Sequence, residues 1–407
     1  MNNCRIVITG MGVISPIGEG ISNFWEAVLS GKSGIREVQA FDTARFRTHN
    51  GAEVINFDVK NYLNCPSVEK MGRASQFAIA ATKSAIEDAN IDPEMIRKSN
   101  IGVSLGTTMG EIQEEEKVSK IWVESGVDKV PANHFLQYPC GNIPRNVAAV
   151  FGLHGPNLMV PTACASGNYA IGYAFDMLKE GKADFMIAGG VDPFSRVAFT
   201  GFNRLLSVAP ETCQPFDGER KGMIVGEGAG ILVMETLESA KKRGASIYAE
   251  VLGYGLGCDA HHMTTPHPEG YGGARAIKAA LDCAGVTIED IDYISAHGTG
   301  TKENDRIETK IIKKVFKERA KEVPMSSIKS MIGHTMGAAS AIEAVLCALV
   351  VKNNKIPPTI NFKIPDPECD LDYVPNVYRE CKVDVALSNA YAFGGNDAAL
   401  LIGKYQE

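Results

Sequence analysis

Paired cysteines are missing from this sequence. Its 10 cysteines are scattered along 407 residues, and none of them forms a Cys-x-x-Cys pair. Structural zinc sites rely on such pairs, and disulfide frameworks belong to short secreted chains that are dense in cysteine. We therefore expect reduced thiols, no metal centre and a cytoplasmic protein. The adjacent His261 and His262 do not change this, because no third ligand follows at a diagnostic spacing.

A surplus of basic residues is missing as well. The chain has 41 Lys and Arg against 48 Asp and Glu, which gives a net charge of -7. No run of Lys and Arg compensates for that balance, so the sequence lacks the positive field of a nucleic-acid-binding protein. It leaves room only for a local basic patch that meets an acidic partner.

Long apolar runs are also missing. The chain begins with a short strand pattern at residues 5–9 rather than with the charged and apolar regions of a signal peptide. The most apolar helical stretch, residues 337–351, is too short to cross a bilayer and includes Glu343. We expect a soluble protein without a membrane segment.

Strand and helix patterns alternate along most of the chain, and 45% of the residues are hydrophobic. This predicts an α/β fold with a large core. Residues 167–179 and 337–351 are each helical and apolar on every side, which is typical of helices in the middle of a protein. Each half of the chain holds one such helix, and no flexible linker separates the halves. We expect two duplicated halves, residues 1–250 and 251–407, that share one core.

A glycine-rich segment follows the first predicted strand. Its pattern, Gly10-x-Gly12-x-x-Ser15, resembles a dinucleotide-binding turn only in outline, because serine takes the third position and Pro16 interrupts the helix that should follow. We interpret the segment as a tight turn.

Cys164 is the first candidate for chemistry. It follows a predicted buried strand at residues 157–161 and precedes the apolar helix at residues 167–179. The free backbone N–H groups at a helix start favour a thiolate, and the small neighbours Ala163 and Ala165 leave room for a substrate. A single cysteine is more often a buried structural residue, but this position favours a nucleophile.

Two histidines follow in the second half. His297 comes directly after a predicted strand at residues 291–296, and His334 lies just before the second apolar helix. The ends of strands in α/β sheets are where sites collect. Each histidine also fits a structural, hydrogen-bonded role, and position alone does not separate the two interpretations.

Three further features lie near these residues in sequence. Lys329 precedes His334 by five positions, although lysine is also an ordinary surface residue. Glu343 lies within the second apolar helix and needs a buried partner, which indicates a structural role. Residues 389–396 read Asn-Ala-Tyr-Ala-Phe-Gly-Gly-Asn, which fits either a glycine turn with core aromatics or a loop that presents a backbone N–H to an oxyanion.

Together these segments resemble the beta-ketoacyl-acyl-carrier-protein synthases, most closely the type II elongation enzymes of the thiolase superfamily. The resemblance covers nearly the whole chain, from residues 7–12 to residues 393–396. Its most specific segments are Thr162-Ala163-Cys164-Ala165-Ser166-Gly167, His297-Gly298-Thr299-Gly300-Thr301, and Lys329-Ser330 with Gly333-His334; residues 215–217, 226–230 and 366–370 support them.

The resemblance implies a thiolase-like, five-layered αβαβα fold and a homodimer, or a heterodimer with a related subunit. It implies that Cys164 accepts an acyl group from an acyl-carrier protein. His297 and His334 would then bind the thioester carbonyl of malonyl-carrier protein as carbon dioxide leaves, and the resulting carbanion would attack the acyl group. The product is a 3-oxoacyl-carrier protein of fatty-acid or polyketide elongation. No cofactor is implied beyond the pantetheine arm of the carrier.

The resemblance also assigns supporting residues. The backbone N–H groups of Cys164 and Phe393 would form the oxyanion hole, and Lys329 and Glu343 would support the site. The remaining assignments are Thr299 and Thr301 to the pantetheine arm, Met109 to the bottom of the acyl pocket, and Lys70 and Arg73 to the carrier-protein patch.

Some positions depart from the pattern of the family. Ala392 precedes Phe393 where glycine is usual, and Lys302 stands where proline is frequent. Ser166 stands where threonine is common, and Gly394-Gly395-Asn396-Asp397 replaces the common Gly-Gly-Thr-Asn. None of these changes removes a catalytic group, but they make a specialised polyketide or polyene pathway a rival to fatty-acid elongation.

Three other functions compete with the synthase. A chain-length-factor-like partner subunit would typically have lost the nucleophile. A thiolase-like coenzyme A enzyme would use a second cysteine where this chain has histidine, and cysteine hydrolases carry different motifs. The presence of Cys164, His297 and His334 together favours the synthase.

Overall fold

A computed structural model of the chain describes residues 4–406. One sheet of 11 strands runs through its centre in the order β11-β10-β14-β15-β9-β1-β8-β7-β5-β6, with β2 paired to β1. The strands of the first half are β1 (Ile6–Ser15), β8 (Gly228–Thr236), β7 (Phe185–Asp192), β5 (Ile101–Gly106) and β6 (Asn157–Val160). Those of the second half are β9 (Ala249–Cys258), β15 (Asn396–Gly403), β14 (Val385–Tyr391), β10 (Tyr293–Ser295) and β11 (Met325–Ser326).

The two halves of the sheet repeat one pairing pattern. In the first half β1, β8 and β7 pair antiparallel, and β7, β5 and β6 pair parallel. In the second half β9, β15 and β14 pair antiparallel, and β14, β10 and β11 pair parallel. A short antiparallel contact between β1 and β9 joins the halves. This repetition is the predicted duplication, although the division at residue 250 stays a prediction.

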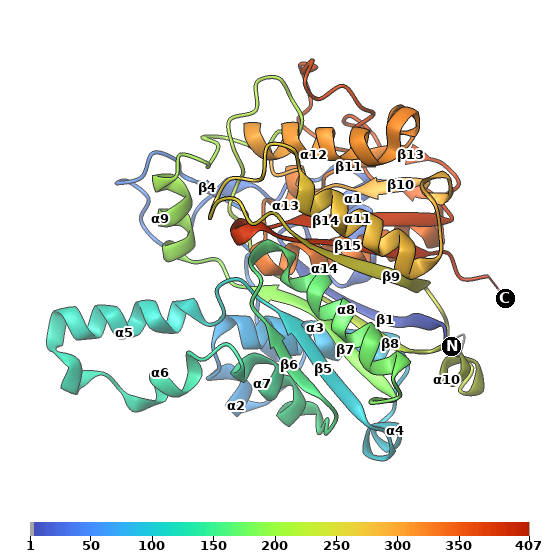
Figure 1. The fold of residues 1–407 in the computed structure, drawn as a ribbon. Coiled ribbons are helices and arrows are strands. Elements are labelled where there is room, and N and C mark those ends of the chain that lie inside the picture. Colours follow the sequence, from blue (N-terminus) through green and yellow to red (C-terminus); the bar gives the residue numbers. More distant parts are fainter. Residues whose placement is uncertain (1–3, 407) are drawn as a thin grey trace.

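Helices cover the sheet in layers (Figure 1). The helices α8 (Ser166–Lys179) and α14 (Ala339–Asn353) lie in the middle and contact strands of both halves. The helices α3 (Arg73–Asp88) and α7 (Asn142–Phe151) pack on the outer side of the first half, and α11 (Tyr271–Ala284) and α12 (Lys302–Phe316) on that of the second. The predicted five-layered αβαβα arrangement is confirmed.

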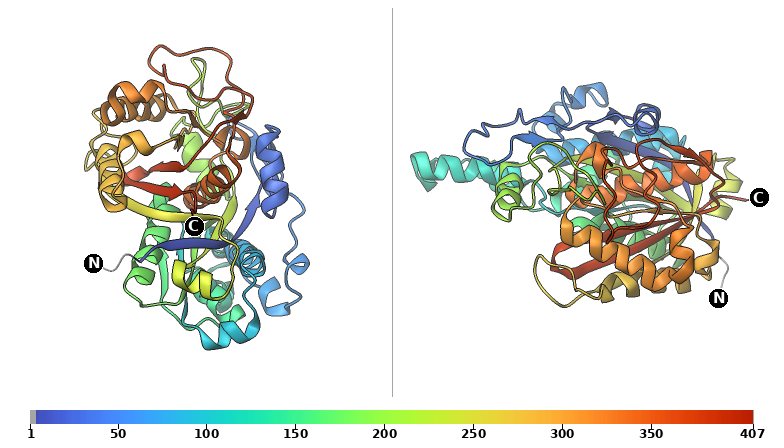
Figure 2. Two further views of the ribbon diagram at one scale, coloured as in Figure 1. Left: turned by 90° about the vertical axis from the view of Figure 1, so that its right-hand side faces the viewer. Right: turned by 90° about the horizontal axis from the view of Figure 1, so that it is seen from above.

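The other helices and strands are short or lie at the periphery. They are α1 (Ile21–Leu29), α2 (Pro66–Glu69), α4 (Pro93–Lys98), α5 (Ile112–Ser125), α6 (Ala132–Gln137), α9 (Arg196–Arg204), α10 (Leu237–Lys242), α13 (Lys329–Ile332), β2 (Gly18–Glu19), β3 (Arg36–Glu37), β4 (Asn50–Gly51), β12 (Lys355–Ile356) and β13 (Arg379–Glu380). The α5–α6 hairpin projects from the body of the molecule, as Figures 1 and 2 show from different directions.

The two central helices are buried as their apolar sequences predict. All residues of α14 from Ala339 to Val351 are buried. One stretch, Met336–Asn353, is long and apolar enough to cross a membrane by composition, but 89% of it is buried inside the fold. A core helix between two half-sheets has the same composition, because it meets apolar side chains on every side.

The interpretation of the glycine-rich segment after residue 9 as a turn was wrong. Gly10 and Gly12 lie inside β1, which continues to Ser15. A Cβ atom on Gly12 would stand 1.9 Å from the carbonyl oxygen of Ala81 on α3. The glycines therefore allow a helix to pack directly on the strand.

The expectation of a fully buried strand at residues 157–161 was also wrong. The strand β6 exposes Asn157 and Leu158 because it is the last strand of the sheet. It still delivers the chain to the turn that carries Cys164.

Candidate active site

Cys164 lies in the turn between β6 and α8, at the centre of the molecule. The turn is a 3₁₀ segment, Ala163–Ala165, in which Ala163 has a left-handed φ of 51°. A residue with a side chain rarely adopts that conformation, and such strain is typical of functional turns. The Cys164 side chain is only 7% exposed.

The fold brings both predicted histidines to this cysteine. His334 Nε2 lies 3.0 Å from Cys164 Sγ. The ring of His297 lies 5.4 Å from the ring of His334, at an angle of 84°. Both histidines are buried. Three side chains that are up to 170 positions apart in sequence thus meet at one point.

Burial keeps these groups uncharged. It raises the pKa of the Cys164 thiol to about 12, against the lowering effects of the Lys329 charge and of backbone N–H groups. Burial, and then the charge of Lys329, lowers the pKa values of His297 and His334 well below the ordinary range. The thiolate expected from the helix start is therefore not the resting state, because desolvation outweighs the helix start. A thiol faces a neutral imidazole that can accept its proton.

The predicted oxyanion donors lie at the sulfur. The backbone N–H groups of Phe393 and of Cys164 itself are hydrogen-bond donors that lower the pKa of the thiol. Phe393 begins a short turn, Phe393–Gly395, between β14 and β15. Its ring is 38% exposed and lies 5.7 Å from the ring of Phe202. The turn thus combines a backbone donor to the buried sulfur with an aromatic side chain at the surface.

Lys329 and Glu343 form a buried ion pair behind the histidines. Their side chains are 0% and 1% exposed, and the Lys329 ammonium donates to Glu343. Burial raises the pKa of Glu343 to about 7, while the Lys329 charge lowers it. The sequence predicted a supporting role for both residues, and the pair supplies the positive charge that disfavours protonated imidazoles.

Glu308 on α12 positions His297 and was missed by the sequence reasoning. Its carboxylate accepts the backbone N–H groups of His297 and Gly298 at 2.8 and 2.7 Å. Burial raises its pKa to about 8, although these hydrogen bonds lower it. The only sequence signal was a polar residue within an amphipathic helix, and that describes most exposed positions equally well.

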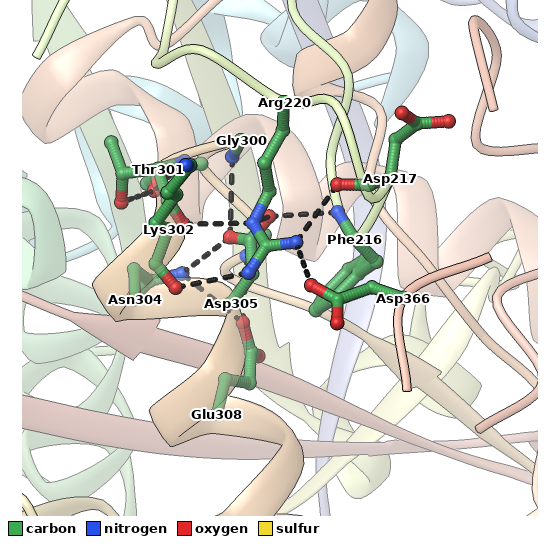
Figure 3. Close-up of polar contacts among 12 residues, drawn as sticks. Phe216, Asp217, Arg220, Gly300, Thr301, Lys302, Asn304, Asp305, Glu308 and Asp366 are labelled. Atoms are coloured by element: carbon green, nitrogen blue, oxygen red, sulfur yellow. Dashed lines mark hydrogen bonds and ion pairs between the residues drawn. The ribbon is translucent and has the colours of Figure 1, made fainter. Parts of the chain in front are cut away.

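A second missed group is the network around Arg220 (Figure 3). The guanidinium donates to the Asp366 carboxylate at 2.5 Å and lies 3.5 Å from Asp305. Asp305 in turn accepts the backbone N–H groups of Gly300 and Phe216 at 3.2 and 2.7 Å. The network ties the glycine loop after the first histidine to α12 and to two distant segments.

Asp192 is the third missed residue. Its carboxylate accepts backbone N–H groups of Thr108, Met109 and Gly337, and the hydroxyl of Thr107, at 2.6 to 2.8 Å. These bonds join the loop after β5 to the segment that leads into α14. Asp192 therefore holds Met109 in place and connects the two halves beside Cys164.

A cavity of about 470 Å³ connects the cysteine with the surface. Its wall includes the buried Cys164, His297 and His334, and also the exposed Lys302 and Thr265. The sulfur is therefore reachable from solvent. The predicted pantetheine contacts Thr299 and Thr301 line the same cavity, whereas Met109 does not, and its place at the acyl end stays a prediction.

The predicted carrier-protein patch needs a correction. Lys70 is exposed, but the Arg73 guanidinium donates to Glu227 at 2.7 and 2.8 Å and to the Val54 carbonyl at 3.0 Å. Glu227 is only 1% exposed. Arg73 is thus committed to an internal ion pair and is not a free surface cation.

The histidine pair at residues 261–262 shows no sign of a metal centre. Among residues 4–406, no group of three or more His, Cys, Asp or Glu side chains stands where it could hold a metal ion. Both histidines lie instead in the exposed loop between β9 and α11.

Comparison with known proteins gives concordant matches along the chain. Residues 3–240 match the family "Beta-ketoacyl synthase, N-terminal domain", and residues 248–363 match "Beta-ketoacyl synthase, C-terminal domain". The chain is 42% identical over 410 residues to "3-oxoacyl-[acyl-carrier-protein] synthase 2" of Staphylococcus aureus (strain MRSA252), with 99% of both chains covered.

Two solved structures share the whole fold. "The ishigamide ketosynthase/chain length factor" superimposes with a TM-score of 0.95 and 41% identity, covering 99% of this chain and 100% of that one. A chain of the structure described as "type II PKS acyl-carrier protein in complex with its ketosynthase bound to the hexaketide" superimposes with a TM-score of 0.91 and 32% identity, with the same coverage.

Proposed function

The chain belongs to the beta-ketoacyl synthase family, and from this premise we propose that it joins an acyl group and malonyl-carrier protein into 3-oxoacyl-carrier protein. It is an acyltransferase that works in two half-reactions. The observation that carries the proposal is the 3.0 Å contact between Cys164 Sγ and His334 Nε2 at the floor of a cavity open to solvent.

In the first half-reaction the Cys164 sulfur attacks the thioester carbonyl of an acyl-carrier protein. The thiol proton passes to His334 Nε2 and from there to the departing pantetheine sulfur. The new bond is the Cys164 thioester, and the broken bond is the carrier thioester. The backbone N–H groups of Cys164 and Phe393 hold the oxyanion of the tetrahedral intermediate.

In the second half-reaction malonyl-carrier protein enters the same cavity. Its thioester carbonyl accepts hydrogen bonds from His297 and His334, and the carbon–carbon bond to the carboxylate breaks to release carbon dioxide and leave an enolate. The enolate carbon attacks the acyl group on Cys164, and the cysteine sulfur leaves as a thiolate and takes up one proton from solvent. Neutral imidazoles suit this role, since they donate without losing a proton to the substrate.

The ring protons are free to occupy the nitrogen that each step requires. The Nδ1 atoms of His297 and His334 are buried, and neither has a hydrogen-bond partner in the described part of the chain. Since a Nδ1 partner normally fixes the tautomer, His334 Nε2 can accept a proton in the first half-reaction and donate a hydrogen bond in the second.

The partner is an acyl-carrier protein, whose pantetheine arm supplies the reacting thiol, so no separate cofactor is proposed. Its docking surface is the rim of the cavity. Lys221 and Lys302 line both the main cavity and an adjacent hollow of about 670 Å³, and Arg47 lines the hollow. Three cations at the entrance suit an acidic carrier protein in the cytoplasm better than the predicted pair that contains Arg73.

The active form is a homodimer. The outer edge of β6 pairs with no strand within residues 4–406, and an unpaired edge is a ready template for a second copy. The nearby α5–α6 hairpin exposes Trp122 (56%), Leu136 (73%) and Phe135 (51%). Light scattering should give twice the chain mass of 43.7 kDa; a chain that dimerises only with a related subunit would contradict this.

The test of the proposal is to incubate the protein with an acyl-carrier thioester and weigh it. We expect Cys164 to gain the acyl mass, and malonyl-carrier protein then to release it as 3-oxoacyl-carrier protein. Cys164→Ala should stay folded and lose both steps, while the exposed Cys283→Ser serves as the matched control. Condensation by Cys164→Ala would overturn the assignment.

A panel of acyl chains decides the pathway. The chain is almost equally similar to the 3-oxoacyl-[acyl-carrier-protein] synthase 2 relative (42%) and to the ishigamide protein (41%). Saturated acyl-carrier thioesters of increasing length and their unsaturated counterparts should therefore be compared by kcat/KM. A preference for unsaturated chains assigns a polyene pathway, and a preference for saturated chains assigns fatty-acid elongation.

A further inference from the structure

The loop between β9 and α11, residues 259–270, is fastened to the turn that carries Phe393; we call it the entrance loop. The backbone N–H of Asp259 donates to the Gly395 carbonyl at 3.0 Å, and that of Gly394 donates to the Met263 carbonyl at 2.8 Å. Several residues of the loop also line the cavity. The position of the entrance loop therefore affects both the turn that carries the Phe393 backbone N–H and the opening of the cavity.

Two carboxyl groups meet where the loop joins the turn. Asp259 is the first residue of the loop, Asp397 follows the turn on β15, and both line the cavity. Asp259 Oδ1 lies 2.8 Å, and Asp397 Oδ2 lies 2.2 Å, from the point where a Cβ atom on Gly272 would stand. These two oxygens therefore lie no more than about 5 Å apart over the start of α11, where glycine at 272 leaves room for both.

The two carboxyls have different partners. Asp259 accepts backbone N–H groups of His267 and Gly272 at 2.7 and 2.9 Å, so both of its oxygens act as acceptors. Asp397, which is 3% exposed, accepts the backbone N–H of Ala392. If one proton is present, it belongs on Asp397, which can then donate to Asp259.

The surroundings of Asp397 favour that proton. Burial, followed by the negative charge of Asp259, raises the pKa of Asp397 to about 8. Burial also raises the pKa values of the neighbouring Tyr391 on β14 and Tyr169 on α8, so neither competes near neutral pH. The other titratable groups that face this space are Cys258 on β9, His262 and His267 in the loop, and Glu308 on α12.

We propose, on the basis of the proposed condensation, that Asp397 is a positioning residue whose carboxyl proton bonds to Asp259 and holds the entrance loop against the Phe393 turn. When Asp397 loses that proton, two carboxylates face each other and the loop separates from the turn. An amide at this position would donate at every pH. The acid makes the same contact dependent on pH.

The conservative variant Asp397→Asn tests this, because it keeps a donor but cannot ionise. We expect kcat/KM of the natural chain for malonyl-carrier protein to fall between pH 7.5 and 9, by up to about tenfold per unit for one proton. The variant should lack this fall. Any pH dependence of kcat/KM that comes from the carrier protein or the histidines should be the same in both proteins. An unchanged alkaline fall in the variant would overturn the proposal.

Hydrogen exchange of the entrance loop gives a readout that needs no turnover. After correction for intrinsic rates, amides in residues 259–270 should lose protection from pH 7 to pH 9 in the natural chain but not in Asp397→Asn. Equal loss in both contradicts the proposal even if the condensation is confirmed. Conversely, absence of acylated Cys164 at every pH would refute the condensation and leave this exchange result standing.

A second variant covers the case in which Asp397→Asn does not fold. Asp259→Asn replaces the second carboxylate with an amide that can donate to ionised Asp397, so the alkaline fall in kcat/KM should disappear in this variant. Circular dichroism confirms the fold of either variant. A fall at an unchanged pH in Asp259→Asn would show that the two carboxyls do not interact, and the proposal would be wrong.

Discussion

His334 Nε2 lies 3.0 Å from Cys164 Sγ, whereas His297 makes no hydrogen bond to the sulfur and meets His334 edge to face at 5.4 Å. The two imidazoles are therefore not equivalent. His334 is hydrogen-bonded to the Cys164 sulfur. His297 lines the cavity without a hydrogen bond to that sulfur. The roles of the two imidazoles therefore differ between the half-reactions, because only His334 accepts the thiol proton in the first one.

We predict that His334→Ala slows both half-reactions and that His297→Ala slows only the second. His334 accepts the thiol proton and later helps to hold the enolate, while His297 contributes only to the enolate. Loss of a positioned proton acceptor or donor typically costs about 10²- to 10⁴-fold. The mass of acyl-Cys164 with time reports the first half-reaction, and carbon dioxide release from malonyl-carrier protein reports the second. Slow acylation in His297→Ala would show that both histidines serve the thiol.

Removal of the buried cation at position 329 should destabilise the chain. Lys329→Met leaves Glu343 buried and unpaired, which typically costs about 3–5 kcal/mol. The loss should be smaller at pH 6 than at pH 8. Burial raises the pKa of Glu343 to about 7 even though the Lys329 charge lowers it, so removal of that charge raises the pKa further and the lone carboxyl is more fully protonated at the lower pH. Urea unfolding at both pH values measures this. The double variant Lys329→Met/Glu343→Gln should recover much of the loss, and equal losses in the single and double variants would refute a coupled pair.

The sequence reasoning could propose groups that react, but it did not find the groups that position them. Cys164, His297 and His334 lie beside small residues at the ends of predicted elements, and that local pattern carries information. Glu308 and Asp192 lie in segments without such a pattern. Their role depends on backbone N–H groups that arrive from elsewhere in the fold, which no local spacing reveals.

The errors in the predicted fold share the same cause. Gly10 and Gly12 have the composition of a turn, yet the backbone of α3 packs on them, so the strand continues. Arg73 has the sequence context of a surface cation, yet Glu227 from a distant segment binds it. The apolar composition of the two central helices, in contrast, predicted the positions of α8 and α14 to within two residues, because a helix that is apolar on every side must be buried on every side.

Charge reversal at the cavity rim should weaken the use of the carrier but not the chemistry. Lys221→Glu and Lys302→Glu remove cations from the entrance, so KM for acyl-carrier protein should rise about tenfold in low salt and less in high salt, which screens the contact. Acylation of Cys164 by a short N-acetylcysteamine thioester, which needs no docking, should report the chemical step alone. Lys70→Glu is the matched comparison at an exposed lysine of the predicted patch. An equal rise in KM there, with none at the rim, would restore the patch predicted from sequence.

Stability should fall as pH rises toward 9, and Asp397→Asn should make that fall shallower. Burial raises the pKa of Asp397 from 3.8 to about 8 in the folded chain. Between these values the folded chain holds a proton that the unfolded chain has lost, so its contribution to stability is present at low pH and declines as pH rises, by at most about 1.4 kcal/mol per unit. Glu308, whose pKa burial raises from 4.5 to about 8, adds a decline of the same sign that persists in the variant. Urea midpoints at pH 5, 7 and 9 measure both slopes. Parallel slopes for the two proteins would mean that Asp397 ionises as readily in the folded chain as in the unfolded one, so the facing carboxylates would cost the fold nothing.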